Sequence, residues 1–252
     1  DECASRMQKH LEKHGIRFLL GNSAKRFDGN KAYMNDGTVV EFDILVLAVG
    51  VRANTSLVRD AGGEVNRGIL VDSCMRTSLP EAGGNIGRGI TVDSRSATSL
   101  PDVYAAGDCT EGEDISFGGR RVLAILPNAY MQGHCAGVRM ADGKEVFDKA
   151  IPMNAVGFFG LHAMTAGTYY GEADGGTCYE EKDENKLKRL FTRDGYLTGF
   201  ILIGETERAG IYTSMIREKT PLDSVNFDVL KKIATSAAFL PEIRRKKFGG
   251  VV

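Results

Sequence analysis

The sequence predicts an α/β protein with a smaller α+β domain at its carboxyl end. The segment 44–49 is continuously apolar, which is typical of a central strand covered on both faces. A second apolar run, 103–106, ends at Gly107, and a helical pattern follows it up to about residue 143. After Ile151 the chain changes to Gly- and aromatic-rich strands and short helices, so we expect a separate domain there.

The composition limits the classes of function. The chain has 252 residues, 42% of them hydrophobic and 26% charged, which suits one or two globular domains. Its formal net charge of -1 and its lack of a long apolar run predict neither a nucleic-acid partner nor a membrane span. The five cysteines contain no C-x-x-C pair, so neither a disulfide framework nor a zinc site is indicated, and a cytoplasmic location is expected.

The amino-terminal segment predicts a helix, a short strand and a hairpin. Apolar residues recur at helical spacing over residues 2–14, and Gly15 is a natural stop for that helix. The segment IRFLLG, residues 16–21, predicts a short strand. The following hairpin is expected to turn at Asp36-Gly37, because this pair tolerates the positive φ angles of a tight turn.

Two adjacent segments are near-copies of each other. Residues 61–81 (copy 1) and residues 82–102 (copy 2) share about 13 identities at an offset of 21. We interpret them as a local tandem duplication, in which one copy supplies a strand that the fold needs and the other is a surface excursion. Because only copy 2 leads into the run 103–106, deletion of copy 1 is expected to leave the fold largely intact.

The segment DVYAAGDC presents a carboxylate at the end of the second apolar run. Gly107 permits a close backbone turn where open α/β sheets place their ligands, and Asp108 follows it. A carboxylate there can accept hydrogen bonds from sugar-like hydroxyls, and the helix beginning near Ile125 can direct backbone N–H groups toward an electron-rich atom. A strand followed by an Asp-containing turn without a ligand is the alternative interpretation.

The carboxyl-terminal segment predicts strands followed by helices. Strands are expected over residues 154–170 and in a second hairpin that turns at Asp194-Gly195. A helix is expected over residues 207–217, with Pro221 beyond its end. The final helical stretch carries a basic cluster of Arg244, Arg245, Lys246 and Lys247. This cluster indicates a solvated helix end, with docking of an acidic electron carrier as the alternative.

The remaining reactive side chains do not form a recognisable site. Cys109 has no partner nearby in the sequence, which favours a small buried residue over a redox thiol. His134 and Cys135 are adjacent and therefore point to different helix faces, and His162 lacks an H-x-x-E companion. We therefore predict no metal site.

Several segments together resemble the pyridine nucleotide-disulfide oxidoreductase family of flavoproteins. They are LVLAVGVRANTSL, NRGILVD, TSLPDVYAAGDC, LPNAYMQG and FILIGETERAGIYTSMIREKTPL. The resemblance covers nearly the whole chain and is strongest to NADH:rubredoxin oxidoreductases and to the flavin part of NADH-dependent nitrite reductases. It implies part of an FAD/NAD(P)-binding Rossmann-like three-layer domain followed by a smaller interface domain.

The resemblance also implies roles for residues around the second apolar run. Asp108 matches the aspartate that holds the ribityl hydroxyls of FAD, and Gly107 gives the close approach. The segment Ala124, Ile125 and Leu126 matches the start of the following helix, where backbone groups meet the flavin ring. These five residues are the expected flavin site.

Two further residues match the passage from the NAD domain back to the FAD domain, namely Ala48 and Gly50. Ala53 departs from the family pattern, which usually has proline there. The His-Pro-Thr motif of the disulfide reductases has no counterpart, because the sequence contains no His-Pro pair. No catalytic side chain is therefore assigned.

The resemblance divides the chain into three parts. Residues 1–48 match the tail of an NAD(P)-binding domain, residues 49–150 the later part of an FAD-binding domain that includes the duplication, and residues 151–252 an interface domain. The sequence contains no G-x-G-x-x-G turn, of which such enzymes need two for the pyrophosphates of FAD and NAD(P)H. The chain is therefore interpreted as the carboxyl half of such an enzyme.

The expected function is an FAD-dependent NAD(P)H oxidoreductase. Electrons would pass from NAD(P)H through flavin to an acceptor such as rubredoxin, the haem module of a nitrite reductase, or oxygen. The fragment alone is expected to be inactive, and a homodimer is expected from the interface domain. The alternative is a noncatalytic dimerisation or docking module, because both pyrophosphate-binding turns are missing from this sequence.

Overall fold

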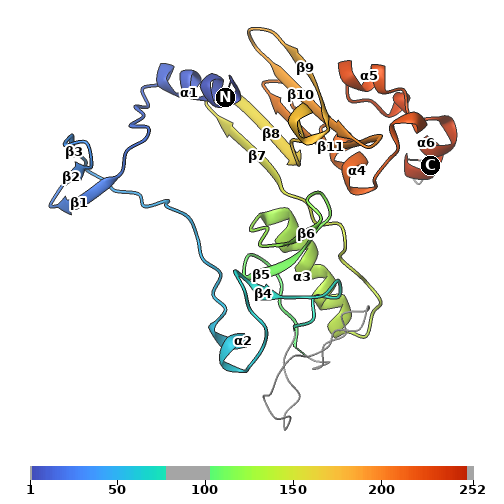
Figure 1. Ribbon diagram of the computed structural model, residues 1–252, viewed down its shortest axis with the longest axis horizontal. Helices are drawn as coiled ribbons and strands as arrows, with labels where there is room; N and C mark the ends of the chain where they lie inside the picture. Colours follow the sequence, from blue (N-terminus) through green and yellow to red (C-terminus); the bar gives the residue numbers. More distant parts are fainter. Residues whose placement is uncertain (1, 78–102, 249–252) are drawn as a thin grey trace. The chain divides into compact units, whose positions relative to one another are not determined.

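The computed structural model describes residues 2–77 and 103–248 (Figure 1). These residues form a mixed α/β protein, which confirms the predicted fold class. They divide into two compact units, of which the first comprises Asp1–Val51 with Phe158–Leu161. The second unit comprises Arg52–Gly157 with His162–Val252. Each unit is described by itself.

The first unit contains one helix and a small antiparallel sheet. Helix α1 (Glu2–Lys13) is followed by strands β1 (Ala24–Asp28), β2 (Lys31–Met34) and β3 (Val39–Glu41) in the order β1-β2-β3. The helix ends at the predicted place, and the hairpin β2–β3 turns at the predicted Asp-Gly pair. In that turn Gly37 has a φ of 89° and the Asp36 carboxylate accepts the Thr38 N–H at 2.9 Å.

Two predicted strands of this unit are wrong. Residues 16–21 form no strand, and the sheet begins instead at β1. Residues 44–49 are also outside any strand, and their side chains are exposed, with Val49 at 93%. A strand is stable only when a neighbour accepts and donates its backbone hydrogen bonds. No segment in the described part of the chain pairs with residues 44–49.

The second unit begins with a region of small elements. They are α2 (Ser56–Asp60), β4 (Ile69–Leu70), β5 (Thr110–Asp114), β6 (Gly119–Arg121) and α3 (Leu126–Met140). β5 is the middle strand of three, parallel to β4 and antiparallel to β6. The predicted strand 103–106 is wrong in extent, since only a single bridge joins Tyr104 to Arg76. The regular strand β5 comes after the Asp108 turn instead of before it.

Copy 1 of the duplication belongs to the core of this region. It supplies β4, and Ile69, Val71 and Met75 are buried in the cluster that packs against α3. At Gly68 a Cβ atom would lie 2.9 Å from the Cys109 carbonyl oxygen, so only glycine lets β4 approach β5. The interpretation of copy 1 as the expendable excursion is therefore corrected. Copy 2 lies outside the described residues.

The rest of the second unit is a five-stranded antiparallel sheet with helices. The strands are β7 (Met153–Phe158), β8 (Leu161–Gly167), β9 (Thr177–Lys182), β10 (Leu187–Arg193) and β11 (Tyr196–Ile203), in the order β7-β8-β11-β10-β9. The hairpin β10–β11 turns at the predicted Asp194-Gly195 pair. A short 3₁₀ helix η1 (Glu172–Asp174) precedes β9.

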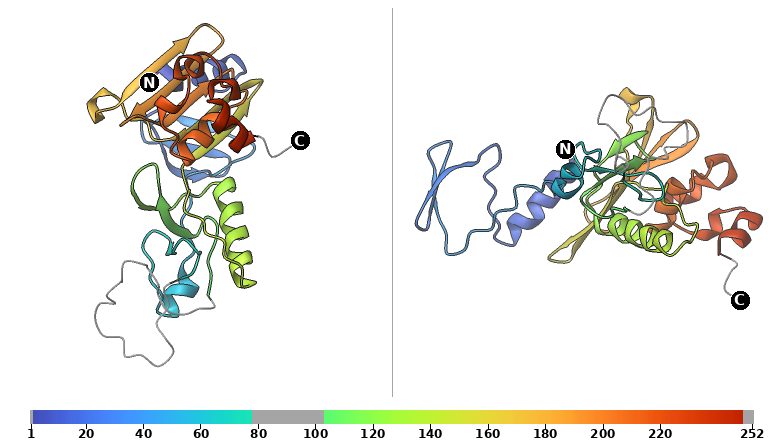
Figure 2. Two further views of the ribbon diagram at one scale, coloured as in Figure 1. Left: turned by 90° about the vertical axis from the view of Figure 1, so that its right-hand side faces the viewer. Right: turned by 90° about the horizontal axis from the view of Figure 1, so that it is seen from below.

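The helices of this region follow the last strand. They are α4 (Gly210–Arg217), η2 (Leu222–Ser224), α5 (Phe227–Lys232), η3 (Ser236–Ala238) and α6 (Pro241–Phe248). α4, α5 and α6 lie together on one side of the sheet (Figure 2). Phe200 of β11 and Tyr212 of α4 pack with their ring centroids 5.7 Å apart in the buried core.

The residues of two hydrophobic cores separate in the sequence near the predicted boundary at residue 150. The core around β4 and α3 draws on residues between Val58 and Phe147, whereas nearly all of the carboxyl-terminal core follows Ile151. The three predicted domain ranges themselves stay a prediction.

Candidate functional site

The predicted flavin residues Gly107 and Asp108 lie in a tight turn just before β5. Gly107 has a φ of 90°, a backbone conformation that favours glycine. The Thr110 backbone N–H and hydroxyl donate to the Gly107 carbonyl oxygen at 3.0 and 2.8 Å, which closes the turn. The side chain of Asp108 is exposed. The turn therefore presents a carboxylate that is free to accept hydrogen bonds from a ligand.

Helix α3 holds this turn through one buried side chain, Gln132. Its Oε1 atom accepts the Gly107 N–H at 2.8 Å and the Thr110 hydroxyl at 3.1 Å. A Cβ atom on Gly107 would lie 3.9 Å from the side chain of Ala129, so the turn packs directly on the helix. These hydrogen bonds fix Gly107 and Thr110, so helix α3 determines where the turn holds Asp108.

The start of α3 has backbone N–H groups without a side-chain cap. Ile125 is the extended residue before the helix, and its side chain makes no capping hydrogen bond. Pro127 lies in the first turn, and Leu126 is 83% exposed. The uncapped end of a helix carries a partial positive charge and attracts electron-rich atoms. The start of α3, next to Ala124, Ile125 and Leu126, therefore has no side chain that caps its backbone N–H groups.

A second buried amide, Asn128, connects the helix to the carboxyl-terminal region. Its Nδ2 atom donates to the Ile151 carbonyl oxygen at 3.1 Å, and its Oδ1 atom has no hydrogen-bond partner among the residues that the structure describes. Asn128 and Gln132 are four residues apart and thus share one face of α3. Two amides at this spacing on the buried face of a helix are the sequence signal that could have found both residues.

Two buried carboxylates of β5 also escape sequence analysis. Glu111 accepts three hydrogen bonds at 2.9 to 3.1 Å, from the Asn66 side chain and from the backbone N–H groups of Arg67 and Gly68. Asp114 accepts the Arg121 Nε–H at 2.6 Å. Both carboxylates are fully used by their own chain, so their role is to hold the strands around the Asp108 turn.

The seven predicted site residues fall into two groups. The structure brings Gly107 into contact with α3, and Asp108 follows Gly107. The helix begins at Leu126, directly after Ala124 and Ile125. Ala48 and Gly50 belong to the first unit, where both are exposed and Gly50 has a φ of 108°. Their assignment to the same site stays a prediction.

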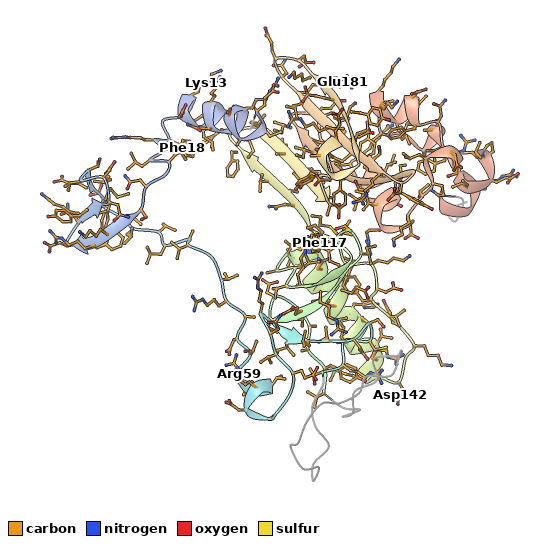
Figure 3. All side chains as sticks on the ribbon, viewed as in Figure 1. Lys13, Phe18, Arg59, Phe117, Asp142 and Glu181 are labelled. Atoms are coloured by element: carbon orange, nitrogen blue, oxygen red, sulfur yellow. The ribbon has the colours of Figure 1, made fainter. Side chains whose placement is uncertain are left out.

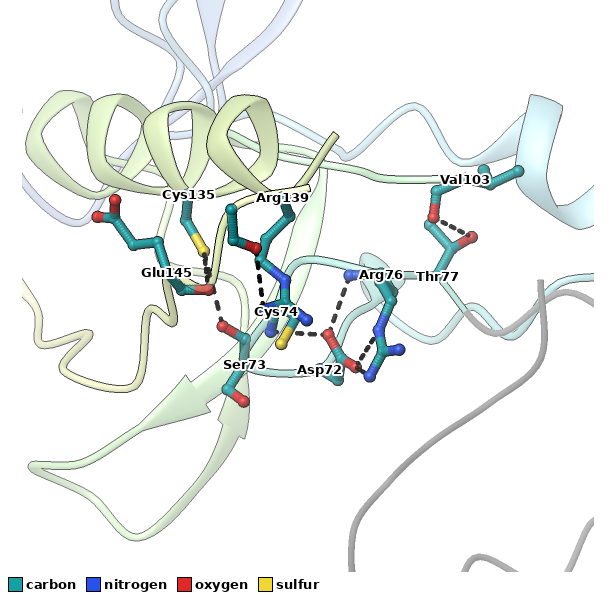
Figure 4. Close-up of polar contacts among 10 residues, drawn as sticks. Asp72, Ser73, Cys74, Arg76, Thr77, Val103, Cys135, Arg139 and Glu145 are labelled. Atoms are coloured by element: carbon teal, nitrogen blue, oxygen red, sulfur yellow. Dashed lines mark hydrogen bonds and ion pairs between the residues drawn. The ribbon is translucent and has the colours of Figure 1, made fainter. Parts of the chain in front are cut away.

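The cysteines and histidines form no metal site in the described residues. All five cysteines lie within the described ranges, and none of them forms a disulfide there. Cys135 is fully buried and donates to the Ser73 and Glu145 carbonyl oxygens (Figure 4). Burial raises the pKa of the Cys135 thiol, which makes it a poor nucleophile. His134 is exposed, and its Nε2 atom lies 3.1 Å from Oε2 of Glu145.

No helix among the described residues is both long and apolar enough to cross a bilayer.

Comparison with known proteins was made along the whole chain. Residues 1–82 match the family model of the pyridine nucleotide-disulphide oxidoreductases. The epsilon subunit of the NADH-dependent phenylglyoxylate dehydrogenase of Aromatoleum evansii is 30% identical over 229 residues, which cover 87% of this chain and 49% of that protein. The nitrite reductase [NAD(P)H] of Bacillus subtilis is 25% identical over 246 residues, 94% of this chain and 27% of that protein.

Solved structures support the fold. An FAD-dependent pyridine nucleotide-disulphide oxidoreductase from Desulfovibrio vulgaris aligns with a TM-score of 0.72 at 24% identity, covering 98% of this chain and 60% of that one. This chain spans 49% of the length of the phenylglyoxylate dehydrogenase subunit and 27% of the length of the nitrite reductase. The predicted resemblance to this family is confirmed.

Proposed function

Because this chain is related to the pyridine nucleotide-disulphide oxidoreductases, we propose that it is the carboxyl half of an FAD-dependent NAD(P)H oxidoreductase. The observation that carries the proposal is the Asp108 turn held on helix α3, whose start has no side-chain cap. The turn offers an exposed carboxylate, and the helix start offers backbone N–H groups. Both belong to one unit and are joined through Gln132.

The donor and acceptor groups of this site fit FAD. The Asp108 carboxylate accepts hydrogen bonds and so suits the ribityl hydroxyls. The backbone of Ala124, Ile125 and Leu126 would hold the electron-rich edge of the ring, where the helix start favours negative charge. Gly107 leaves the approach open because it has no side chain. FAD bound here would supply the chemistry of accepting a hydride from NAD(P)H and passing electrons to an acceptor.

The side chains of this region would bind and orient the cofactor and not transfer protons. Glu111 and Asp114 are consumed by hydrogen bonds within the chain, and Gln132 is occupied by the turn. We propose a small electron carrier such as rubredoxin, a haem module of the nitrite-reductase type, or oxygen as the acceptor. We also propose a homodimer and a location in the cytoplasm.

The test joins this chain to the residues encoded upstream of Asp1. An upstream open frame with two G-x-G-x-x-G turns and a flavin absorption band in the purified protein are the expected results. The variant Asp108→Ala should retain FAD about tenfold more weakly, because a charged hydrogen-bond acceptor is lost. Asp223→Ala is the control, since Asp223 is exposed and distant in sequence. A colourless protein that takes up no added FAD would contradict the proposal.

A second candidate is a noncatalytic dimerisation or docking module. It is favoured by the absence of any G-x-G-x-x-G turn from this sequence, because FAD affinity without a pyrophosphate-binding turn should be low. Gel filtration of this chain at micromolar concentration shows whether it forms a dimer, as a dimerisation module would. A dimer supports the module, whereas a monomer at all concentrations tested rules it out.

A further inference from the structure

A pocket of about 400 Å³ opens between the β5–β6 turn and the carboxyl-terminal sheet. It lies wholly within the second unit, and its walls contain none of the predicted flavin residues. The residues that matter for its chemistry are Phe117, Tyr170, Arg193, Tyr196 and Lys219. Its volume is within the range of about 300 to 1,000 Å³ typical of sites for small organic ligands.

Aromatic side chains form much of the wall. Phe117, labelled at the β5–β6 turn in Figure 3, is 60% exposed although it is a large apolar residue. The Arg121 guanidinium lies over its ring at 5.1 Å while its Nε–H donates to Asp114 at 2.6 Å. This cation–π contact stabilises the position of the Phe117 ring. Tyr196 at the start of β11 adds a second exposed ring to the pocket.

The charged groups of the pocket have a positive excess. The Arg193 guanidinium lies 5.0 Å above the ring of Tyr170, and its Nε is 3.4 Å from the Asp194 carboxylate. That carboxylate is 83% exposed, so the ion pair is long and strongly solvated. Lys219 has no ion pair with any described residue. Two cations thus face the pocket against one weakly held carboxylate.

We propose that this pocket binds a small aromatic carboxylate. The ring packs against Phe117 and Tyr196, where apolar contact and aromatic stacking stabilise it. The carboxylate is held by Arg193, whose planar fork suits bidentate contact, and by Lys219. This site lies apart from the Asp108 turn and adds a binding activity to the proposed oxidoreductase function.

The test titrates this chain with 4-fluorobenzoate and follows the ligand by ¹⁹F NMR. We expect saturable binding with a Kd below about 1 mM, which corresponds to about -4 kcal/mol. The neutral 4-fluorobenzyl alcohol should bind about fivefold more weakly or worse, because it lacks the charge that Arg193 recognises. Phe117→Ala and Arg193→Gln should each weaken benzoate binding about fivefold or more.

Matched controls come from the first unit. Phe159 is 58% exposed and is the control for Phe117. Arg26 is the control for Arg193, because its guanidinium lies 3.4 Å from the Asp28 carboxylate and over the ring of Tyr33. Neither residue lines the pocket. Phe159→Ala and Arg26→Gln should leave the Kd within about twofold. Absence of saturation up to about 10 mM would overturn the proposal. Equal effects of pocket and control variants would overturn it as well.

Discussion

The two parts of the second unit are held together in different ways. The region after Ile151 has five paired strands and an apolar core in which Phe200, Tyr212 and Leu230 are almost fully buried. The region before it has a strand of only two residues, β4, and depends on buried polar groups such as Glu111 and Gln132. The later region is held by apolar burial, whereas the earlier region combines a smaller apolar cluster with a few directed hydrogen bonds.

This difference has a practical meaning for substitutions. Loss of a large apolar side chain should be most damaging after Ile151, whereas before it the change of a single buried acceptor atom should also lower stability measurably. The predictions below test this contrast in order of decreasing effect.

The largest effect is expected for Phe200→Ala. Phe200 is fully buried against Tyr212, so the substitution should lower the free energy of unfolding by about 3–5 kcal/mol. Urea denaturation measures the loss, and hydrogen exchange should show reduced protection mainly in β8 to β11. Phe159→Ala, which removes an exposed ring that stacks on His14, should lower stability by no more than about 1.5 kcal/mol. Equal losses in both variants would refute the apolar account of this region.

A pair of deletions tests the region before Ile151 through the duplication. Removal of copy 2 keeps the buried Met75 and the ion pair of Arg76 with Asp72, whereas removal of copy 1 puts Ser96 and Ala97 at the matching sequence positions. The copy 1 deletion should therefore be less stable than the copy 2 deletion by about 2–5 kcal/mol. Both chains have the same length, so each controls for the other in thermal unfolding. A more stable copy 1 deletion would restore the original interpretation.

A smaller effect is expected for Glu111→Gln. The carboxylate becomes a neutral amide, so the hydrogen bonds from residues 66–68 lose their charge-assisted acceptor, and one of the two accepting oxygens becomes an NH₂ donor. The expected loss is about 1–3 kcal/mol, with faster hydrogen exchange in β4. Glu113→Gln is a matched control, because Glu113 belongs to the same strand and is exposed. If both variants lose the same stability, Glu111 does not hold β4.

The smallest effect concerns acid sensitivity of the edge strand β9. Hydrogen bonding to Lys182 and Arg189 lowers the pKa of Glu180, and hydrogen bonding to Lys188 and Lys186 lowers that of Glu181. A carboxylate with a lowered pKa in the folded state contributes stability above its unfolded pKa, and this stability is lost as the pH falls through the folded pKa.

Both glutamates are partly exposed, so their joint contribution should be below about 1 kcal/mol at low salt and smaller in high salt. Urea midpoints measured at about pH 6 and about pH 3 should therefore differ less in the double variant E180Q/E181Q than in the unchanged chain. Identical pH dependence of the two proteins would show that these ion pairs do not stabilise β9.

The same contrast explains what could be predicted from the sequence. The hairpin at Asp194-Gly195 and the helix near residues 207–217 were predictable because turn residues and apolar spacing act locally. The segment 44–49 has the composition of a buried strand, but strand formation depends on a neighbour that the described residues do not provide.

The candidate site follows the same division. Gly107 and Asp108 could be found because they form one short motif, and the left-handed conformation of Gly107 is as expected. Gln132 could not be found from that motif, since its hydrogen bond to Gly107 spans 25 residues. Sequence patterns report local geometry, whereas contacts between distant polar groups become visible only in three dimensions.

The close approach at Gly68 has a genetic consequence. Copy 2 also has glycine, isoleucine and valine at the positions that match Gly68, Ile69 and Val71, namely Gly89, Ile90 and Val92. Recombination between the two repeats would excise 21 residues in frame and leave one glycine at the crowded position, whichever copy is lost. The duplication is therefore reversible by a single unequal exchange that does not forfeit the glycine on which β4 depends.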